Sequence, residues 1–240
     1  GTASYAFTTP TTLVDESIDV SDTYVGGPQG IVSYTAPSPT YFYYARTESG
    51  VAGTCTDYDN TASFVTNDTA ATGSADETVT LCVGLDLTVS KTAVPTFTRT
   101  FSWDITKVAD ETYVEIANGD DYTFNYTVGV THNAGVDSAW AISGVITITN
   151  PNDWEAITLT SLDDVALPGG TCLLASGPYV VPVSGSLDVA YSCTFAGGAS
   201  GINTATAVWD AEAYATPTGT AFGTASYAFT TPTTLVDESI

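Results

Sequence analysis

Residues 77–94 read ETVTLCVGLDLTVSKTAV, a nearly unbroken alternation of apolar and polar side chains. A period of two places one set of side chains on each face of an extended chain, so the pattern predicts β-strand. The same alternation, rich in β-branched and aromatic residues, recurs in RTFSWDITKV (99–108), DYTFNYTVGVTH (121–132), WAISGVITITN (140–150), SLDVAYSCTF (186–195) and NTATAVWDAEAY (203–214). No segment has the 3.6-residue apolar stripe of a helix. We therefore expect an all-β protein.

Turn signals separate these predicted strands. They are VGGPQG (25–30), APSPT (36–40), NGDD (118–121), NPND (150–153), LPGG (167–170) and AGGASG (196–201). Short strands with turn signals every ~8–12 residues are typical of antiparallel β-sandwiches. A weak internal similarity between YDNTASFVTND (58–68) and GINTATAVWDA (201–211) suggests two related sandwiches. We expect one domain over about 1–85 and a larger one over 86–222.

The chain restarts near its end. Residues 1–18 read GTASYAFTTPTTLVDESI, and residues 223–240 repeat them letter for letter, which gives a repeat of 222 residues. Eighteen consecutive identities are not a coincidence. Self-similarity at a fixed period is the signature of tandem arrays. We therefore interpret 223–240 as the start of the next copy in a head-to-tail array of repeats.

The repeated segment could complete the fold of the copy before it. The edge strand of a sandwich is a template for another strand, and an added strand gains backbone hydrogen bonds and side-chain pockets. We expect Tyr227, Phe229 and Leu235 to be inward-facing anchors of such a donor strand, with Pro232 marking a break. A head-to-tail contact that does not close builds a filament. Tandem domains without strand sharing, or an artificial duplication, remain alternatives.

Two strings connect the sequence to a family. LDLTVSKTA (85–93) opens the second predicted domain and NTATAV (203–208) closes it, and both resemble the Ig-like conserved repeat domain modules of bacterial and archaeal surface proteins. TRTFSWDITKVAD, DSAWAISGVITITNPN and YDNTASFVTNDTAATGS are similar to segments of secreted bacterial repeat proteins. The resemblance covers roughly half of the chain and implies two tandem Ig-like sandwiches, an extracellular or cell-surface location and a spacer, stalk or filament role. A shared fold implies no site.

The charge balance excludes several classes of partner. The chain has 4 Lys and Arg against 27 Asp and Glu, for a net charge of −23. Nucleic acids and anionic membranes are bound through Lys/Arg clusters, so neither is an expected partner. No apolar run is long enough to insert directly into a membrane. One His and no nucleophile motif or phosphate loop give no catalytic set, so we expect no enzyme.

Four cysteines, Cys55, Cys82, Cys172 and Cys193, have no metal-site spacing. An even number of widely spaced cysteines indicates disulfides and an oxidising compartment. Three connectivities are possible, and we favour Cys55–Cys82 with Cys172–Cys193 because each pair is local within one predicted domain. Four buried free thiols are the alternative.

Acidic loops offer the one candidate cofactor site, for calcium. Ca²⁺ takes oxygen ligands from carboxylates and carbonyls, and DVSD (19–22) and NGDD (118–121) place such oxygens on turns. The candidate ligands are Asp19, Asp22, Asp120 and Asp121. None of these loops matches the EF-hand pattern, and solvated acids on an acidic surface explain them equally.

Two modifications are candidates. Asn67-Asp-Thr and Asn125-Tyr-Thr fit the N-glycosylation sequon, with Asn67 in a turn-like stretch and Asn125 inside a predicted strand. An internal Lys–Asn isopeptide bond, which some bacterial surface sandwiches contain, could join Lys107 on an early strand to Asn203 on a late one.

The expected function is that of a structural subunit of an extracellular filament or surface stalk, whose partners are copies of itself. The alternative is an adhesin that binds glycans or another cell through acidic or aromatic faces. PTYFYYAR (39–46) is the densest aromatic cluster, and alternation would expose Tyr41 and Tyr43.

Overall fold

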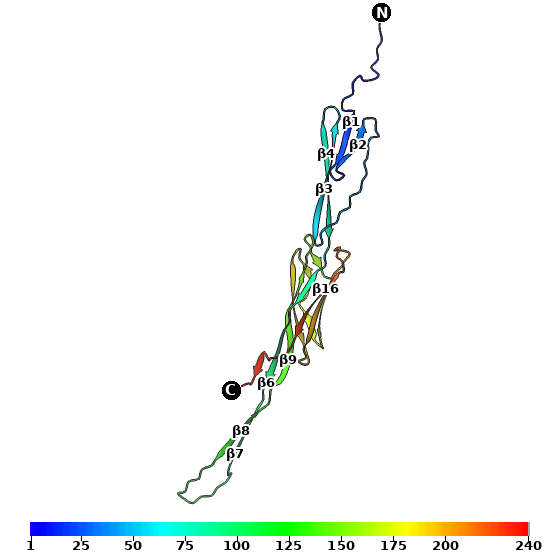
Figure 1. Ribbon diagram of the computed structural model, residues 1–240. Coiled ribbons are helices and arrows are strands. Elements are labelled where there is room, and N and C mark those ends of the chain that lie inside the picture. The colour runs from blue at the N-terminus through cyan, green and yellow to red at the C-terminus, as the bar shows by residue number, and fades with distance from the viewer. Residues whose placement is uncertain (240) are drawn as a thin grey trace. The chain divides into compact units, whose positions relative to one another are not determined.

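The computed structural model describes residues 1–239. These residues form strands, turns and irregular chain without any helix, and the chain divides into two compact units (Figure 1). Unit 1 comprises Gly1–Gly84 and unit 2 comprises Leu85–Ile240. The division falls one residue before the boundary that the sequence predicts, and the repeated segment belongs to unit 2. The prediction of an all-β protein is therefore confirmed for the described residues.

Unit 1 is a single antiparallel sheet of four strands in the order β2-β1-β3-β4. The strands are β1 (Ser17–Asp22), β2 (Gly27–Ser33), β3 (Thr54–Thr66) and β4 (Thr72–Val83). The long β3–β4 hairpin pairs Thr54 with Val83 at one end and Val65 with Thr72 at the other. None of the fully buried apolar side chains in the described structure lies in this unit, since the first of them is Leu87. Unit 1 therefore has no closed hydrophobic core.

The connection between β2 and β3 lies over one face of that sheet. The residues from Tyr34 to Val51 form no strand. The Tyr44 hydroxyl donates a 2.7 Å hydrogen bond to the Asp22 carboxylate, and a Cβ at Gly30 would lie 3.1 Å from the Phe42 ring. This connection covers part of the face that carries Ile18 and Val20. The aromatic-rich stretch 39–46 is thus a covering loop rather than a strand.

Unit 2 contains two larger sheets. One has six strands in the order β12-β14-β9-β6-β17, with β5 also paired to β9. The other has three strands in the order β11-β15-β16, and β10 and β13 form a small separate pair. The bounds are β5 (Thr88–Lys91), β6 (Val94–Thr100), β9 (Val136–Thr149), β10 (Ile157–Thr158), β11 (Ser161–Leu167), β12 (Thr171–Leu174), β13 (Val180–Val181), β14 (Ser186–Thr194), β15 (Gly201–Val208), β16 (Thr220–Tyr227) and β17 (Thr234–Val236).

The core of unit 2 lies between its sheets. On β9 the alternation buries Ile142, Ile146 and Ile148, and on β15 it buries Ala205 and Ala207. These residues belong to one cluster of buried side chains that draws on both large sheets. Paired antiparallel sheets with an apolar interior are consistent with a β-sandwich.

A separate hairpin interrupts unit 2 between β6 and β9. It consists of β7 (Trp103–Ala109) and β8 (Tyr126–His132), which pair with each other and with no other named strand of the described structure. Figure 1 shows this hairpin extending beyond the end of β6 and β9. The sequence predicts strands at both positions but gives no sign that the hairpin stands apart from the sandwich.

Both disulfides that the sequence favours are formed, Cys55–Cys82 and Cys172–Cys193. Each joins directly opposite residues of neighbouring strands, β3 with β4 and β12 with β14. The described residues contain no free cysteine. Two disulfides are consistent with an oxidising environment. The same residues include no helix that could cross a membrane.

Candidate functional site

The repeated segment is built into unit 2 through strand β16. This strand starts at Thr220 and ends at Tyr227, so it crosses the junction between Phe222 and Gly223 where the sequence restarts. It pairs antiparallel with β15 along its whole length, from Val208↔Thr220 to Gly201↔Tyr227. The repeat's own last residues and the first residues of the restart therefore form one continuous edge strand of the three-stranded sheet.

Gly223 and Tyr227 fit this strand closely against its surroundings. A Cβ at Gly223 would lie 2.6 Å from the Val89 carbonyl oxygen of β5, closer than Cβ atoms ever approach other atoms. Four residues on, the Tyr227 side chain is 4% exposed and its hydroxyl donates a 2.9 Å hydrogen bond to the Leu167 carbonyl. The alternation of β16 leaves Ser226, between them, exposed.

Beyond β16 the segment adds an aromatic ring to the core. The Phe229 ring lies 5.1 Å from Trp140, 5.6 Å from Phe195 and 6.3 Å from Phe97, all edge-on. Edge-to-face contacts at 4.5–7 Å are the favoured geometry of aromatic pairs. The ring also lies 5.7 Å from Tyr227. The segment thus contributes two of the five rings in this cluster.

The segment then pairs with a second edge. Thr233 hydrogen-bonds to Phe97 through its amide and hydroxyl groups, at 2.9 and 3.0 Å from the Phe97 carbonyl. Strand β17 follows and pairs in parallel with β6, with Val236 opposite Thr100. The Trp103 indole donates a 2.7 Å hydrogen bond to the Asp237 carbonyl. Residues 223–237 therefore contact both large sheets of unit 2.

The identical residues at the other end of the chain make none of these contacts. Residues 1–16 form no strand, and Tyr5 and Phe7 are 84% and 96% exposed. A Cβ at Gly1 would meet nothing within 4 Å. The first strand begins only at Ser17. One sequence is thus present once as a packed strand and once as an exposed, unpaired segment.

The three predicted anchors behave differently. Tyr227 is buried and Phe229 packs against the core, but Leu235 is 46% exposed. The expectation for Leu235 is wrong because the chain turns after Phe229, around Pro232, before it resumes pairing on β6. After the turn, it is Thr233 rather than Leu235 that fixes the segment, through its hydrogen bonds to Phe97. Alternation before a turn does not predict which side chains face inward after it.

The four aspartates predicted for calcium do not converge. Asp22 is buried in β1, and its carboxylate accepts hydrogen bonds from Tyr44, Asn60 and the Tyr24 amide, whereas Asp19 is exposed. Asp120 and Asp121 are exposed at the far end of the β7–β8 hairpin. Within the described residues, the one group of three potential ligands is Asp164, Cys172 and Cys193, and its sulfurs are joined in a disulfide.

The two sequon asparagines are both exposed. Asn67 lies in the turn between β3 and β4, as expected, and its side chain donates to Glu16. Asn125 is not inside a strand, since β8 begins one residue later, and its side chain donates to Asp110. Both side-chain amides are therefore accessible at turns or strand ends.

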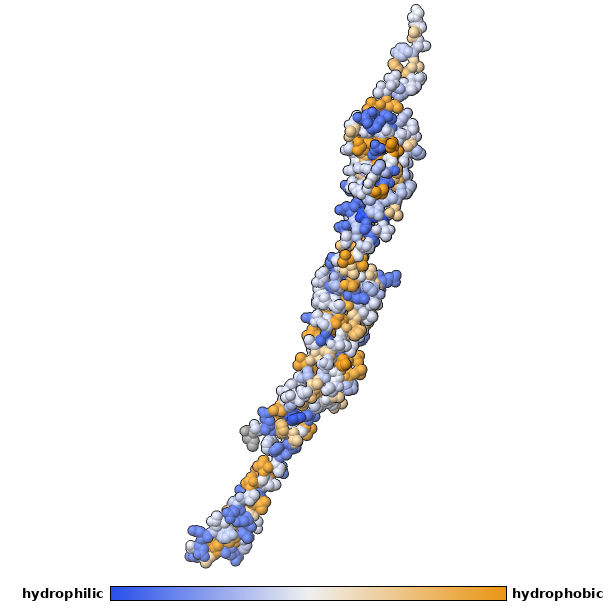
Figure 2. Space-filling model, in the orientation of Figure 1, coloured by the Kyte–Doolittle hydropathy of each residue, from blue (hydrophilic) through white to orange (hydrophobic). Residues whose placement is uncertain are grey.

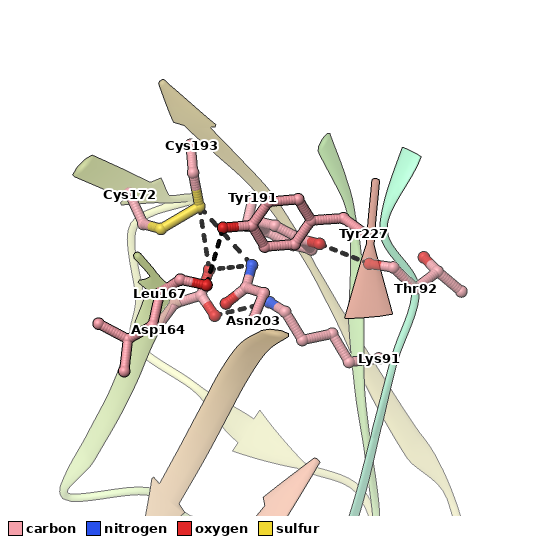
Figure 3. The surroundings of a disulfide bond; sticks show 9 residues. All are labelled: Lys91, Thr92, Asp164, Leu167, Cys172, Tyr191, Cys193, Asn203 and Tyr227. Atoms are coloured by element: carbon pink, nitrogen blue, oxygen red, sulfur yellow. Dashed lines mark hydrogen bonds and ion pairs between the residues drawn. A yellow bond between two sulfur atoms is a disulfide. The ribbon is translucent and has the colours of Figure 1, made fainter. Parts of the chain in front are cut away.

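The isopeptide candidate Lys107 is wrong. Lys107 lies on the exposed β7–β8 hairpin, where its ammonium group is 4.5 Å from the Tyr126 ring centroid. The lysine that accompanies Asn203 is Lys91, because both hydrogen-bond to the Asp164 carboxylate (Figure 3). The sequence could have identified Lys91, because it lies two residues after Val89 and four after Leu87 on an alternating strand and so faces the core as they do.

Comparison of the chain with models of protein families, with characterised proteins and with solved structures finds no match. The function must therefore be argued from the geometry.

Proposed function

We propose that this chain is a structural subunit of an extracellular filament or surface stalk, in which each copy completes the fold of the copy before it. The first residues of one copy complete β16 and form β17 of the preceding unit 2. The observation that supports this most directly is the contrast between the two identical segments, one exposed at residues 1–14 and one packed at 223–237. An exposed segment that already has a fitted site in the same molecule is a natural link between copies.

The architecture and chemistry support a mechanical role. Strand addition joins the end of one copy to the beginning of the next, so the contact is heterologous and continues into a linear array. Two disulfides and an acidic surface suit an oxidising, extracellular setting. The resemblance of LDLTVSKTA and NTATAV to Ig-like surface modules points the same way.

The test uses a chain that ends at Phe222 and so lacks its own packed segment. Each such chain has an exposed donor and an empty acceptor, and we expect linear polymers by electron microscopy and sedimentation. Tyr5→Asp should abolish polymerisation, because the equivalent Tyr227 is buried. Ser4→Asp is the matched control, because the equivalent Ser226 is exposed. Monomers in the parent chain, or equal behaviour of the two variants, would overturn the proposal.

A second measurement decides how copies are joined. Because β16 crosses the junction at Phe222 and Gly223, an uninterrupted chain is the simpler link. The native assembly, boiled and reduced, should then run far above one repeat on a denaturing gel. A single band near one repeat would mean separate subunits joined only by strand addition.

The adhesin alternative rests on exposed rings in unit 1. Tyr41 and Tyr43 are both exposed, with centroids 6.1 Å apart and planes tilted by 35°, and exposed aromatic rings can stack on sugars. Binding of the monomeric chain to a glycan array, lost in Tyr43→Ala, would favour that function.

A further inference from the structure

The interior of unit 2 contains a buried ion pair. Lys91 on β5 places its Nζ 2.6 Å from Oδ1 of Asp164 on β11, and the two side chains are 0% and 1% exposed. The Lys91 ammonium also lies 3.2 Å from the Tyr191 ring centroid. Buried ion pairs are costly and give weak evidence of stabilisation, so this one calls for a chemical explanation.

A third buried group completes the cluster. Asn203 on β15 is fully buried, and its Nδ2 donates a 3.2 Å hydrogen bond to Oδ2 of Asp164. Its carbonyl oxygen Oδ1 has no hydrogen-bond partner. Figure 3 shows the Lys91 amine and the Asn203 carboxamide side by side on the same carboxylate. A buried amide oxygen without a partner is uncommon in a folded protein.

Burial of Lys91 disfavours the charged form of its amine. Burial lowers the pKa of Lys91, and the hydrogen bond that Lys91 donates to the Asp164 carboxylate only partly opposes this. An uncharged amine next to a protonated carboxyl differs from the ion pair by the transfer of one proton along the 2.6 Å contact. A lysine deprotonated in an apolar site is a nucleophile.

We propose that Lys91 and Asn203 become joined by an intramolecular amide bond. The neutral Lys91 Nζ attacks the Asn203 Cγ to form a Cγ–Nζ bond, and the Cγ–Nδ2 bond breaks. Asp164 accepts the proton that Nζ loses and delivers one to Nδ2, which leaves as ammonia. Amine and primary amide become secondary amide and ammonia, so atoms balance and no oxidant or cofactor is needed.

The bond would link the two large sheets. Lys91 belongs to the six-stranded sheet through β5, and Asn203 to the three-stranded sheet through β15. The neighbouring disulfide, Cys172–Cys193, joins strands within one sheet only. An amide bond between sheets resists both reduction and the separation of the sandwich under load.

The test is the intact mass of the folded, purified chain after disulfide reduction. We expect a mass below that of the sequence by one ammonia, and a branched peptide after digestion that joins residues 88–91 to residues 201–208. Asp164→Asn should restore the full sequence mass while both reacting residues remain. Lys107→Arg, the control on the exposed hairpin, should keep the ammonia loss.

The branched peptide separates this bond from ammonia loss elsewhere, such as at Asn118-Gly119. A folded parent chain of full sequence mass, or an ammonia loss without a peptide that contains Lys91 and Asn203, overturns the proposal. Neither result depends on whether the variants fold.

A second observation concerns the β7–β8 hairpin, whose two faces differ. Trp103 and Ile105 on β7 share a face with Val128 and Val130 on β8, and all four are exposed. Lys107, opposite Val128, is the charged residue of this otherwise mainly apolar face. The opposite face carries Asp104, Thr106 and Thr127, with Val108 as its one large apolar side chain. Figure 2 shows apolar residues on the visible surface of this hairpin. An isolated two-stranded hairpin is marginal in water and requires a partner for its apolar face.

Unit 1 has the complementary feature. The β2–β3 connection covers only part of one face of the unit's sheet, and a groove lined by Ile18, Val20, Ala62 and Phe64 stays open on that face. No apolar side chain of this unit is fully buried in the described structure. A sheet with one open apolar face needs a second layer to form a core.

In the proposed array, the register starts these two elements at the same level in consecutive copies. Val236 pairs with Thr100 in parallel, and Val236 is equivalent to Val14 of the next copy. Three residues further on, β7 begins at Trp103 and β1 begins at Ser17. β1 already has a neighbour on each side, β2 and β3, so a hairpin that runs beside β1 can contact the face of that sheet but cannot pair with β1.

We infer that the hairpin of one copy covers the open face of unit 1 in the next copy. This inference rests on the proposed array. It is tested in a chain of two joined copies by hydrogen exchange of residues 103–132, compared with the single chain. Only one of the two hairpins has a following unit 1, so we expect a protected and an unprotected population.

Val128→Asp should remove the protected population, and Thr127→Asp on the polar face should leave it. Equal exchange of the hairpin in single and joined copies would overturn the inference. The proposed array is tested separately, by polymerisation of the chain that ends at Phe222 and its Tyr5→Asp variant. The failure of either proposal can therefore be recognised independently.

Discussion

At the scale of single residues, the first glycine of the repeated segment is required in only one of its two positions. Gly223→Val would place a side chain against the Val89 carbonyl, 2.6 Å from the position of a Cβ, whereas Gly1→Val meets open space. We expect Gly223→Val to lower the free energy of unfolding of unit 2 by about 1–3 kcal/mol, as overpacking does. Gly1→Val should leave it unchanged. Urea unfolding of the two variants measures the difference, and equal effects would contradict the packing described.

Asp22 gives unit 1 a specific acid sensitivity. Burial raises the pKa of Asp22, but hydrogen bonds from Tyr44, the Tyr24 amide and Asn60 outweigh it, so the net pKa is below the ordinary 3.8. The unfolded chain then binds a proton before the folded one does. The stabilisation is present above pH 3.8 and is lost as the pH falls through the lower folded pKa.

We therefore expect the protection of residues 17–33 against hydrogen exchange, relative to the unfolded chain at the same pH, to fall below pH 3.8 in the parent chain. In Asp22→Asn the exchange should already be faster at neutral pH and should depend less on acid. A parallel pH response in both chains would show that other carboxylates control the unit.

Residue-level inference from sequence succeeds where alternation is unbroken. It correctly places Tyr227 and Phe229 inward, but the break at Pro232 makes Leu235 an error. The wrong lysine has another cause: Lys107 also lies on an alternating strand, but that strand has no core to face. Alternation predicts two faces and does not reveal which strand has a second sheet against it.

At the scale of elements, the sequence predicts most strands near their observed positions. The segments 140–150 and 186–195 match β9 and β14 closely, because these strands alternate between a buried and an exposed face. The long stretch 77–94 is divided at Gly84 between two units, which its pattern does not reveal. Pairing order and the parallel β17–β6 contact depend on residues far apart in the chain, so local patterning could not give them.

The two disulfides are an element-scale prediction that extends to energy. Cysteine separations of 27 and 21 residues close loops that contribute about 3 kcal/mol each in the chain-entropy estimate. We expect replacing Cys55 and Cys82 together by Ala to destabilise unit 1 while unit 2 unfolds at its original urea concentration. Replacing Cys172 and Cys193 together by Ala should destabilise unit 2 and leave the unfolding of unit 1 at its original urea concentration. Loss of both transitions from one replacement would contradict independent units.

At the scale of the whole molecule, the exact duplication is the one functional signal that the sequence shows directly. It predicts a continuing array but not which surfaces meet, because the acceptor is assembled from β15, β5 and β6, distant segments brought together only by folding. The open face of unit 1 and the exposed hairpin are likewise invisible in composition. Both surfaces have the alternating pattern of core strands, and only the structure shows that their apolar residues are not buried.

The net charge opposes the association of copies in the proposed array. The net charge is −23, and the repeated residues include only Asp237 and Glu238 as charged groups, which leaves −21 for each 222-residue repeat. Like charge slows association, and salt relieves it as the Debye length falls from about 30 Å at 0.01 M to about 10 Å at 0.1 M. We expect polymerisation of the chain that ends at Phe222 to accelerate over that range, measured by light scattering.

Calcium and magnesium at equal concentration separate screening from a specific site. Asp19, Asp22, Asp120 and Asp121 do not share a site in the described structure, so we expect the two ions to accelerate polymerisation equally. A faster rate in calcium alone, lost on adding a chelator, would mean that assembly creates a calcium site at the contact between copies. A rate that falls with added salt would instead show that attraction between unlike charges dominates that contact. The chain has only 4 Lys and Arg to provide such attraction, so we do not expect this result.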